Sequence, residues 1–156
     1  MFAPTAPVWR GLLLASLLAA SPARAQVSRG AAAKFVAGSA IALAAHETGH
    51  LTFDLAFGAR PHVKRVHLGA IPFFAIAHRD DMPRHEEFII SSAGFLVQAA
   101  GDEWILTSYP HLRHMRAPVL KGMLAFNTLT SVGYAAVAFA RVGPDERDTR
   151  AIAAAA

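Results

Sequence analysis

The chain has 156 residues, of which 54% are hydrophobic and only 17% are charged. Its mean hydropathy of +0.34 is above what a soluble domain of this size usually needs, and its length favours one compact unit. It contains no cysteine, which excludes disulfides, thiolate metal sites and cysteine nucleophiles. The formal net charge of +4 is accompanied by no nucleic-acid-binding motif or basic stripe, so we expect no nucleic-acid partner.

Residues 1–25 have the pattern of a secretory signal peptide. Arg10 precedes a run of Leu and Ala, and Ala23-Arg24-Ala25 matches an A-x-A cleavage site. We expect cleavage after this segment, which leaves residues 26–156 as a single membrane-embedded domain. An uncleaved segment that acts as an extra anchor is the alternative.

The first predicted helix, residues 31–58, carries an H-E-x-x-H motif in an otherwise apolar sequence. His46 and His50 lie four positions apart on one face, so two imidazoles can reach one tetrahedral zinc ion. Glu47 flanks that face, where it can accept the proton of a metal-activated water. The apolar stretch is long enough to cross a bilayer, where ionisable groups without partners are expensive. The motif therefore predicts zinc hydrolysis in or beside a membrane, and two hydrogen-bonded core histidines are the alternative.

Small residues share the histidine face of this helix, among them Gly38, Ala42 and Gly49. Because small residues allow two helix backbones to approach closely, we expect another helix to pack along this stripe. The patch Ser91-Ser92-Ala93-Gly94 of the next predicted helix is the candidate partner.

Residues 62–78 are rich in β-branched and aromatic side chains, and Gly69 and Pro72 are turn or bulge positions. This pattern predicts a short β-hairpin. Its open edge could hold an extended peptide substrate through main-chain hydrogen bonds, or the segment could be a connector that makes no substrate contact. For the histidines of this segment we expect interfacial or solvated roles.

Two further helices are predicted, over residues 84–107 and 118–141. The later of the two is the clearest transmembrane candidate. Gln98 and Asn127 are amides inside these apolar helices. Either could bind a substrate carbonyl, although hydrogen bonding between helices is the more common role of such amides in membrane bundles.

A third zinc ligand is not specified by the motif. Asp102 is the first choice, because an acid within an apolar helix is a functional candidate by default. The charged segment after the last predicted helix ranks second, with Asp145 and Asp148. Other acids are Glu103, beside Asp102, and Glu87, whose place in a first helical turn is also explained by the helix dipole.

The order of these features resembles the site-2 protease family of intramembrane zinc metallopeptidases, over about residues 35–100. The matching features are the H-E-x-G-H helix, the β segment that begins near residues 58–60, and the helix with the S-S-A-G patch. The resemblance implies that His46 and His50 bind zinc, that Glu47 is the base, and that the substrate is a transmembrane or membrane-proximal peptide bond. The family's third ligand is an Asp in an L-D-G type motif, which this chain lacks.

Together these patterns predict a mainly α-helical, membrane-embedded bundle of about three core helices with a short hairpin between the first and second. We expect a zinc-dependent metallopeptidase-like protein, multi-pass in a bacterial-type inner membrane, with lipid and a peptide or membrane-protein substrate as partners. Two alternatives remain: a non-catalytic membrane protein that keeps a metal or histidine site, and a secreted soluble zinc hydrolase.

Overall fold

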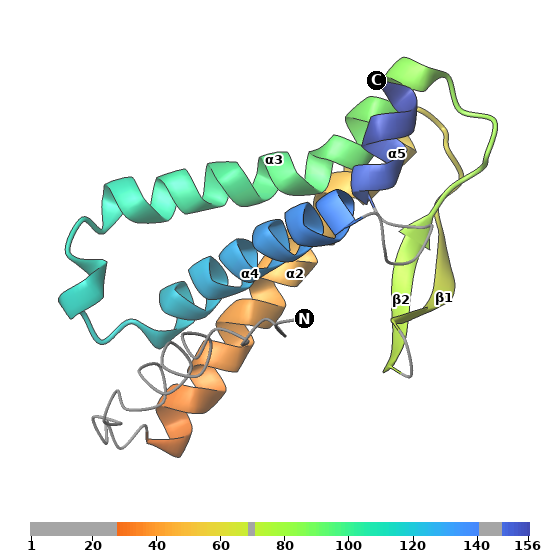
Figure 1. Ribbon diagram of the computed structural model, residues 1–156. Helices are drawn as coiled ribbons and strands as arrows, with labels where there is room; N and C mark the ends of the chain where they lie inside the picture. The colour runs from red at the N-terminus through yellow and green to blue at the C-terminus, as the bar shows by residue number, and fades with distance from the viewer. Residues whose placement is uncertain (1–27, 69–70, 141–147) are drawn as a thin grey trace, which may run out of the picture.

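A computed structural model describes residues 28–68, 71–140 and 148–156 (Figure 1). Over these residues the protein is mainly α-helical with one antiparallel hairpin, as the sequence predicts. The predicted signal segment, residues 1–25, lies outside the described residues.

The first described helix, α2 (Arg29–Ala56), begins at Ser28, whose side chain accepts a hydrogen bond from the Ala31 amide. This is the usual way in which a serine N-cap satisfies a free amide of the first turn. The helix ends at a left-handed backbone position, Gly58 with φ 63°, which glycine adopts without strain. The helix buries one stripe of small and polar residues: Gly38, Ala42, His46, Gly49, His50 and Asp54.

The hairpin consists of β1 (His62–Leu68) and β2 (Ile71–Ala77), paired antiparallel from His62 opposite Ala77 to Leu68 opposite Ile71. The predicted hairpin over residues 62–78 is thus confirmed. Figure 1 shows it projecting beside the end of the helical bundle where α2 gives way to β1. The amide of Arg79, just after β2, donates to the carbonyl of the buried Ala59, in the connection between α2 and β1, which closes the base of the hairpin.

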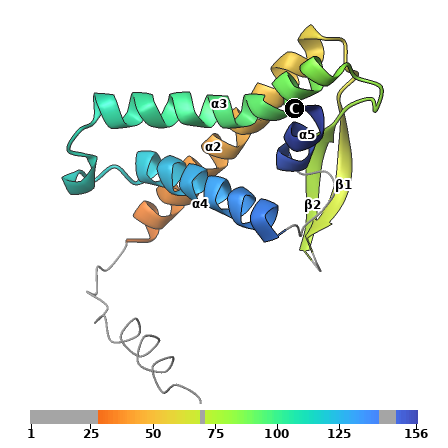
Figure 2. The same cartoon turned by 45° about the horizontal axis from the view of Figure 1, so that its top comes forward.

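Two long helices complete the bundle, α3 (Arg84–Ser108) and α4 (Pro118–Ala140), joined through a short 3-10 helix, η1 (Leu112–His114). Proline at the first position of α4 suits a helix start, because that position needs no amide donor. Helix α2 packs against both α3 and α4 (Figures 1 and 2).

Glycines set the closeness of these helix contacts. A Cβ on Gly38 would overlap the Val119 carbonyl of α4, and a Cβ on Gly122 of α4 would overlap the Phe35 carbonyl of α2. On the other side, a Cβ on Gly49 would lie 2.8 Å from the Ala93 carbonyl oxygen of α3. The predicted contact between the small stripe of α2 and the S-S-A-G patch is therefore confirmed, and α4 makes a second contact of the same kind.

The last helix, α5 (Asp148–Ala155), was not predicted, because the sequence there reads as a charged run followed by alanines. It lies against the N-terminal half of α3 (Figure 2), where Arg84 donates to the Ala154 carbonyl at 3.2 Å. This return brings Asp148 back to the middle of the bundle.

Of the described helices, α4 is the one long and apolar enough to cross a membrane by length and composition. Only 6% of its most apolar window is buried inside the protein, whereas the core helix of a soluble protein would be mostly buried. Helices α2 and α3 do not meet the same test, so the multi-pass arrangement stays a prediction.

Candidate metal centre

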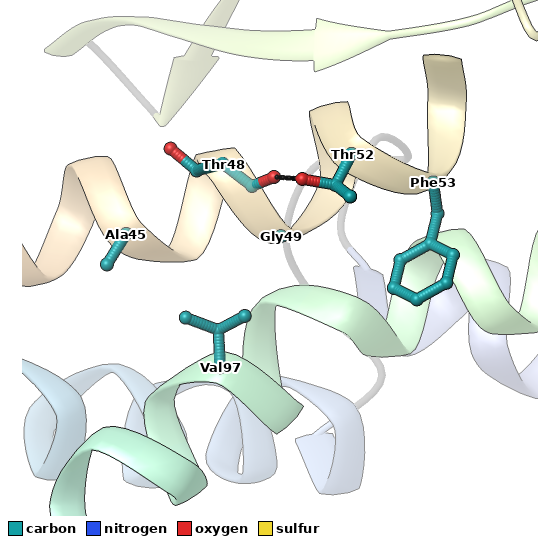
Figure 3. A pocket seen from close by; sticks show the side chains of 6 residues that line it. All are labelled: Ala45, Thr48, Gly49, Thr52, Phe53 and Val97. Atoms are coloured by element: carbon teal, nitrogen blue, oxygen red, sulfur yellow. Dashed lines mark hydrogen bonds between the residues drawn. The ribbon is translucent and has the colours of Figure 1, made fainter. Parts of the chain in front are cut away.

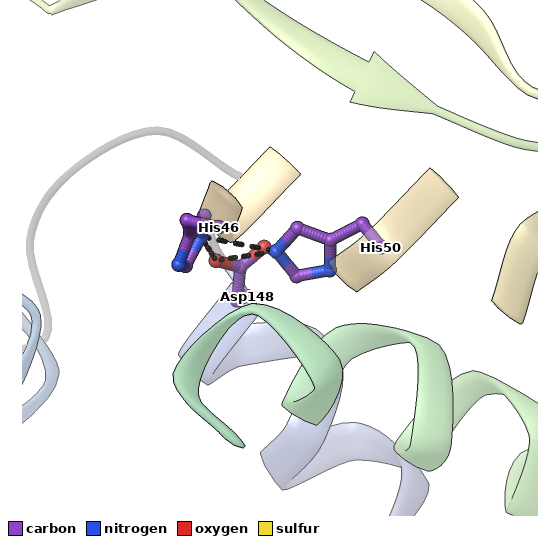
Figure 4. A group of neighbouring side chains, drawn as sticks. All are labelled: His46, His50 and Asp148. Atoms are coloured by element: carbon purple, nitrogen blue, oxygen red, sulfur yellow. Dashed lines mark hydrogen bonds and ion pairs between the residues drawn. The ribbon is translucent and has the colours of Figure 1, made fainter. Parts of the chain in front are cut away.

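Three side chains far apart in the sequence converge at the centre of the bundle: His46 and His50 from α2 and Asp148 from the start of α5 (Figure 4). The two Nε2 atoms lie 3.0 Å apart, and Asp148 Oδ2 lies 3.4 Å from His46 Nε2 and 3.5 Å from His50 Nε2. Both imidazoles are buried and Asp148 is largely so. This group could bind a metal ion.

The three donor atoms have the spacing of a tetrahedral site. Ligand atoms that bind zinc at about 2.0–2.2 Å in a tetrahedron are about 3.3 Å from one another. The observed separations of 3.0, 3.4 and 3.5 Å are close to that value. A borderline metal with nitrogen and oxygen ligands therefore fits the residues present.

The tautomer of His50 is determined by its second ring nitrogen. Its Nδ1–H donates to the backbone carbonyl of Ile90 in α3 at 2.7 Å. When this imidazole is neutral, as a metal ligand must be, its single N–H is the one at Nδ1, and the Nε2 lone pair is available to an ion between His46 and Asp148. Metal-binding histidines usually have this kind of second hydrogen bond. The Nδ1 of His46 is buried without a hydrogen-bond partner among the described residues.

Gly94 of α3 makes room for both rings. A Cβ at this position would overlap His46 and come within 2.5 Å of His50 Nε2. The S-S-A-G patch thus serves the candidate metal centre directly, because its glycine lies against the imidazoles.

Asp148 is held as a carboxylate by its neighbours. Burial by itself would raise the pKa of Asp148, but the hydrogen bonds with His46 and His50 outweigh burial and lower that pKa to about 2. The Tyr134 hydroxyl of α4 is also within hydrogen-bonding reach of Asp148. The third donor is therefore ionised at neutral pH, as a metal ligand must be.

Tyr134 was not singled out by the sequence, where it is one aromatic residue in an apolar helix. Its ring packs edge-on against Phe95, with centroids 5.2 Å apart, and Phe95 packs edge-on against His46 at 5.5 Å. Its phenol is a hydrogen-bonding group beside the candidate ligands. The sequence does not show that Asp148 is its partner, because the two residues meet only when α5 folds back onto the bundle.

Glu47 lies beside the donor group without being part of it. It is half-buried and close enough to interact electrostatically with His46, His50 and Asp148. Glu47 is thus an acidic side chain near the three donors that is not itself one of them.

Asp102, the first choice for the third ligand, lies elsewhere. It accepts a hydrogen bond from the Asn127 amide of α4 at 2.6 Å and is not in the group with His46 and His50. We expected the Asp102 carboxylate to bind the metal because it lies in an apolar helix, but its partner is the Asn127 amide. Asn127 therefore joins α3 to α4, the common role of such amides in membrane bundles.

The other predicted acids have separate places. Glu103 is exposed on α3, and Glu87 binds His78 and Ser91. Asp145 lies outside the described residues. Asp148, from the same charged run, is the acid that the structure brings to the histidines.

An open depression of about 270 Å³ lies along the seam between α2 and α3 (Figure 3). Its lining is mostly apolar and includes Thr48 and Phe53 of α2 and Val97 of α3. Neither of the two histidines nor Glu47 lines it, so it is not the metal centre.

Comparison with known proteins finds no match to a family model, to a curated protein or to a solved structure.

Proposed function

We propose that the protein is a membrane-embedded zinc metallopeptidase that hydrolyses peptide bonds in or near the membrane. The main support is the convergence of His46, His50 and Asp148 on one point with Glu47 at its side. Bound Zn²⁺ would activate water and polarise the peptide carbonyl. His46, His50 and Asp148 would hold the ion, and Glu47 would accept the proton of the attacking water and deliver it to the leaving amine.

The exterior of the helices supports the membrane part of the proposal. Large apolar side chains are exposed on all three long helices, for example Ile41 (50%), Leu96 (63%) and Leu129 (73%). Exposed side chains of this kind cost free energy in water, whereas lipid solvates them at no cost. These side chains favour a lipid-facing exterior over a secreted soluble hydrolase.

The proposal is tested by metal analysis of the protein purified in mild detergent. We expect about one zinc per chain, lost in His46→Ala, His50→Ala and Asp148→Ala. The matched control is Asp102→Asn, which we expect to retain zinc because Asp102 pairs with Asn127 rather than with the histidines. Wild-type protein that holds no zinc and takes up none at micromolar concentration would refute the proposal.

Catalysis needs its own measurement, because a non-catalytic metal site would give the same zinc content. We expect slow hydrolysis of a fluorescently labelled transmembrane peptide in detergent, abolished in Glu47→Gln while zinc stays bound. If wild-type and Glu47→Gln protein cleave at the same rate, Glu47 is not the base and the peptidase assignment fails.

A further inference from the structure

A second, partly buried polar cluster joins the base of the hairpin to two helices. His78 follows β2 directly, and its Nδ1 lies 3.1 Å from Asp54 Oδ1 of α2. Its Nε2 lies 2.7 Å from Glu87 Oε2 of α3. On the same carboxylate, Glu87 Oε1 accepts a hydrogen bond from the Ser91 hydroxyl at 3.1 Å. The chain Asp54–His78–Glu87–Ser91 thus crosses from α2 through the hairpin base to α3.

The chemistry of the cluster favours a charged histidine between two carboxylates. The hydrogen bond with Asp54 raises the pKa of His78 to about 9; burial opposes this rise and Glu87 adds to it. At neutral pH both ring nitrogens therefore carry protons, and each donates to one carboxylate. Asp54 is fully buried, and apart from His78 its oxygens have no hydrogen-bond partner among the described residues. A buried carboxylate without a partner is destabilising, so separating His78 from Asp54 would cost free energy.

The cluster is one helical turn from the metal centre on both helices. Asp54 is four residues after His50, so both lie on the buried stripe of α2. Glu87 and Ser91 lie in the first turns of α3, and Ile90 of the same turns accepts the Nδ1–H of His50. The position of these turns of α3 relative to α2 therefore decides whether Ile90 can hold the His50 ring.

We propose that His78 is a positioning residue of the metal centre: by bridging Asp54 and Glu87, it holds α3 against α2 so that the Ile90 carbonyl keeps the His50 Nε2 lone pair free for the metal. This inference rests on the proposed metal site, but it concerns residues that are not themselves ligands. It also makes the hairpin part of the metal centre's support, because His78 is attached to the end of β2.

The experiment compares His78→Gln with His85→Gln, a matched control on an exposed histidine seven residues later whose side chain is 76% accessible. Cobalt(II) serves as the metal probe, because its visible absorption reports ligand geometry. We expect His78→Gln to weaken Co²⁺ binding about 10- to 100-fold and to change the absorption spectrum, as loss of a ligand-orienting partner does. The His85 variant should match wild type in both.

A measurement without metal separates this inference from the proposed function. At a pH where the His50 ring is neutral, nitrogen-15 NMR of the metal-free protein should show His50 protonated at Nδ1 in wild type and a mixture of tautomers in His78→Gln. If the wild-type protein binds no Co²⁺, the metal site fails and His78 has no centre to position, while the tautomer comparison still shows whether His78 controls His50. If His78→Gln binds Co²⁺ like wild type and keeps the Nδ1 tautomer, the positioning role is refuted.

A second variant guards against a misfolded His78→Gln protein. Glu87→Gln keeps an acceptor oxygen for the His78 Nε2–H but removes the charge, so the contact is weakened rather than lost. We expect a smaller fall in Co²⁺ affinity with the same change in absorption. Unchanged affinity and spectrum in a folded Glu87→Gln protein would argue against the bridge.

Discussion

Gly94 of α3 lies against the imidazoles of both His46 and His50. A methyl group at Gly94 would lie 2.6 Å from His46 Nδ1. The helices cannot easily move apart to make room, because α2 and α3 are also in close contact at Gly49. We expect Gly94→Ala to weaken zinc binding at least about 10-fold, because the rings must rotate away from their common point. Isothermal titration with zinc in detergent measures this change.

Gly101 is the matched control for that substitution. It lies on the same helix, and a Cβ there would meet nothing within 4 Å. Gly101→Ala should leave zinc affinity unchanged and stabilise the helix by up to about 1 kcal/mol, the usual gain of alanine over glycine. Equal zinc affinity in the Gly94 and Gly101 variants would show that the imidazoles do not need the space at Gly94.

The Tyr134 hydroxyl of α4 should affect metal binding by orienting the Asp148 carboxylate, which lies within its hydrogen-bonding reach. Carboxylate ligands are commonly oriented by a hydrogen-bond donor of this kind, whose loss costs about 10- to 100-fold in metal affinity. We expect Tyr134→Phe to weaken zinc binding toward the low end of that range, because its ring contact with Phe95 survives. Tyr109→Phe, with its ring packed on Trp104 away from the ligands, should bind zinc like wild type, as a competition assay with a chromogenic chelator would show.

At the residue scale, the sequence locates the local part of the metal centre and misses the part that depends on tertiary structure. His46, Glu47 and His50 lie within one helical turn, so helix geometry alone brings them together. Asp148 is about a hundred residues away, and its arrival depends on the return of α5, which no periodicity encodes. Asp102 was preferred because it is an acid within an apolar helix, and the sequence does not show that Asn127, 25 residues later on another helix, is its partner.

The close packing of α2 on α4 depends on two glycines that each face a backbone carbonyl of the other helix. We expect Gly122→Ala to destabilise the protein by about 1–3 kcal/mol, because the methyl group must push the Phe35 carbonyl away. Gly133→Ala on the same helix faces open space and should be neutral or slightly stabilising. Thermal unfolding followed by circular dichroism compares the two, and equal melting temperatures would show that the helices are not in close contact.

The attachment of the hairpin to the bundle should depend on pH through His78. Because the folded-state pKa of about 9 exceeds the ordinary value of 6.5, the contribution is complete below about pH 6.5 and is lost as pH rises through 9. Asp54 and Glu87 are the charged groups that face the ring. We expect a loss on the order of 1 kcal/mol, reduced by solvent screening of the partly exposed pair, and a flatter pH profile in His78→Gln. Melting temperatures between pH 6 and 10 test this, and identical profiles would contradict it.

At the element scale, the sequence was most informative where the pattern is long. The three long helices and the hairpin are found within a few residues of their predicted positions, because their apolar runs and Pro or Gly boundaries are local signals. Helix α5 is eight residues long, too short to be stable alone, and forms where it can pack on α3. The role of His78 was likewise invisible, because its two carboxylates come from different helices.

In the part of the chain that the structure describes, polar and small residues form most of the interior, and many large apolar residues are exposed. Within the described residues, the buried polar or charged side chains are His46, His50, Asp54, Ser91, Gln98 and Asn127. The large hydrophobic side chains that are buried there number three: Ile90, Ile105 and Leu112. If the protein is embedded in a membrane, as we propose, close backbone packing and interhelical hydrogen bonds would hold this core together in place of hydrophobic burial.

Two matched charge insertions test this arrangement. Leu129 is 73% exposed at the middle of α4, and Val63 is 72% exposed on β1, outside the helices. If α4 crosses the bilayer, Leu129→Arg costs about 2.5–3.5 kcal/mol of insertion free energy, the value for arginine at the centre of a span. We expect wild-type and Val63→Arg protein to stay in the membrane pellet after alkaline carbonate washing, and a large part of Leu129→Arg to be released or degraded.

In a water-soluble protein both substitutions would be equivalent surface changes of less than about 0.5 kcal/mol, and wild type itself would leave the pellet. Because the two residues are almost equally exposed, a large difference between them would point to a lipid environment around α4.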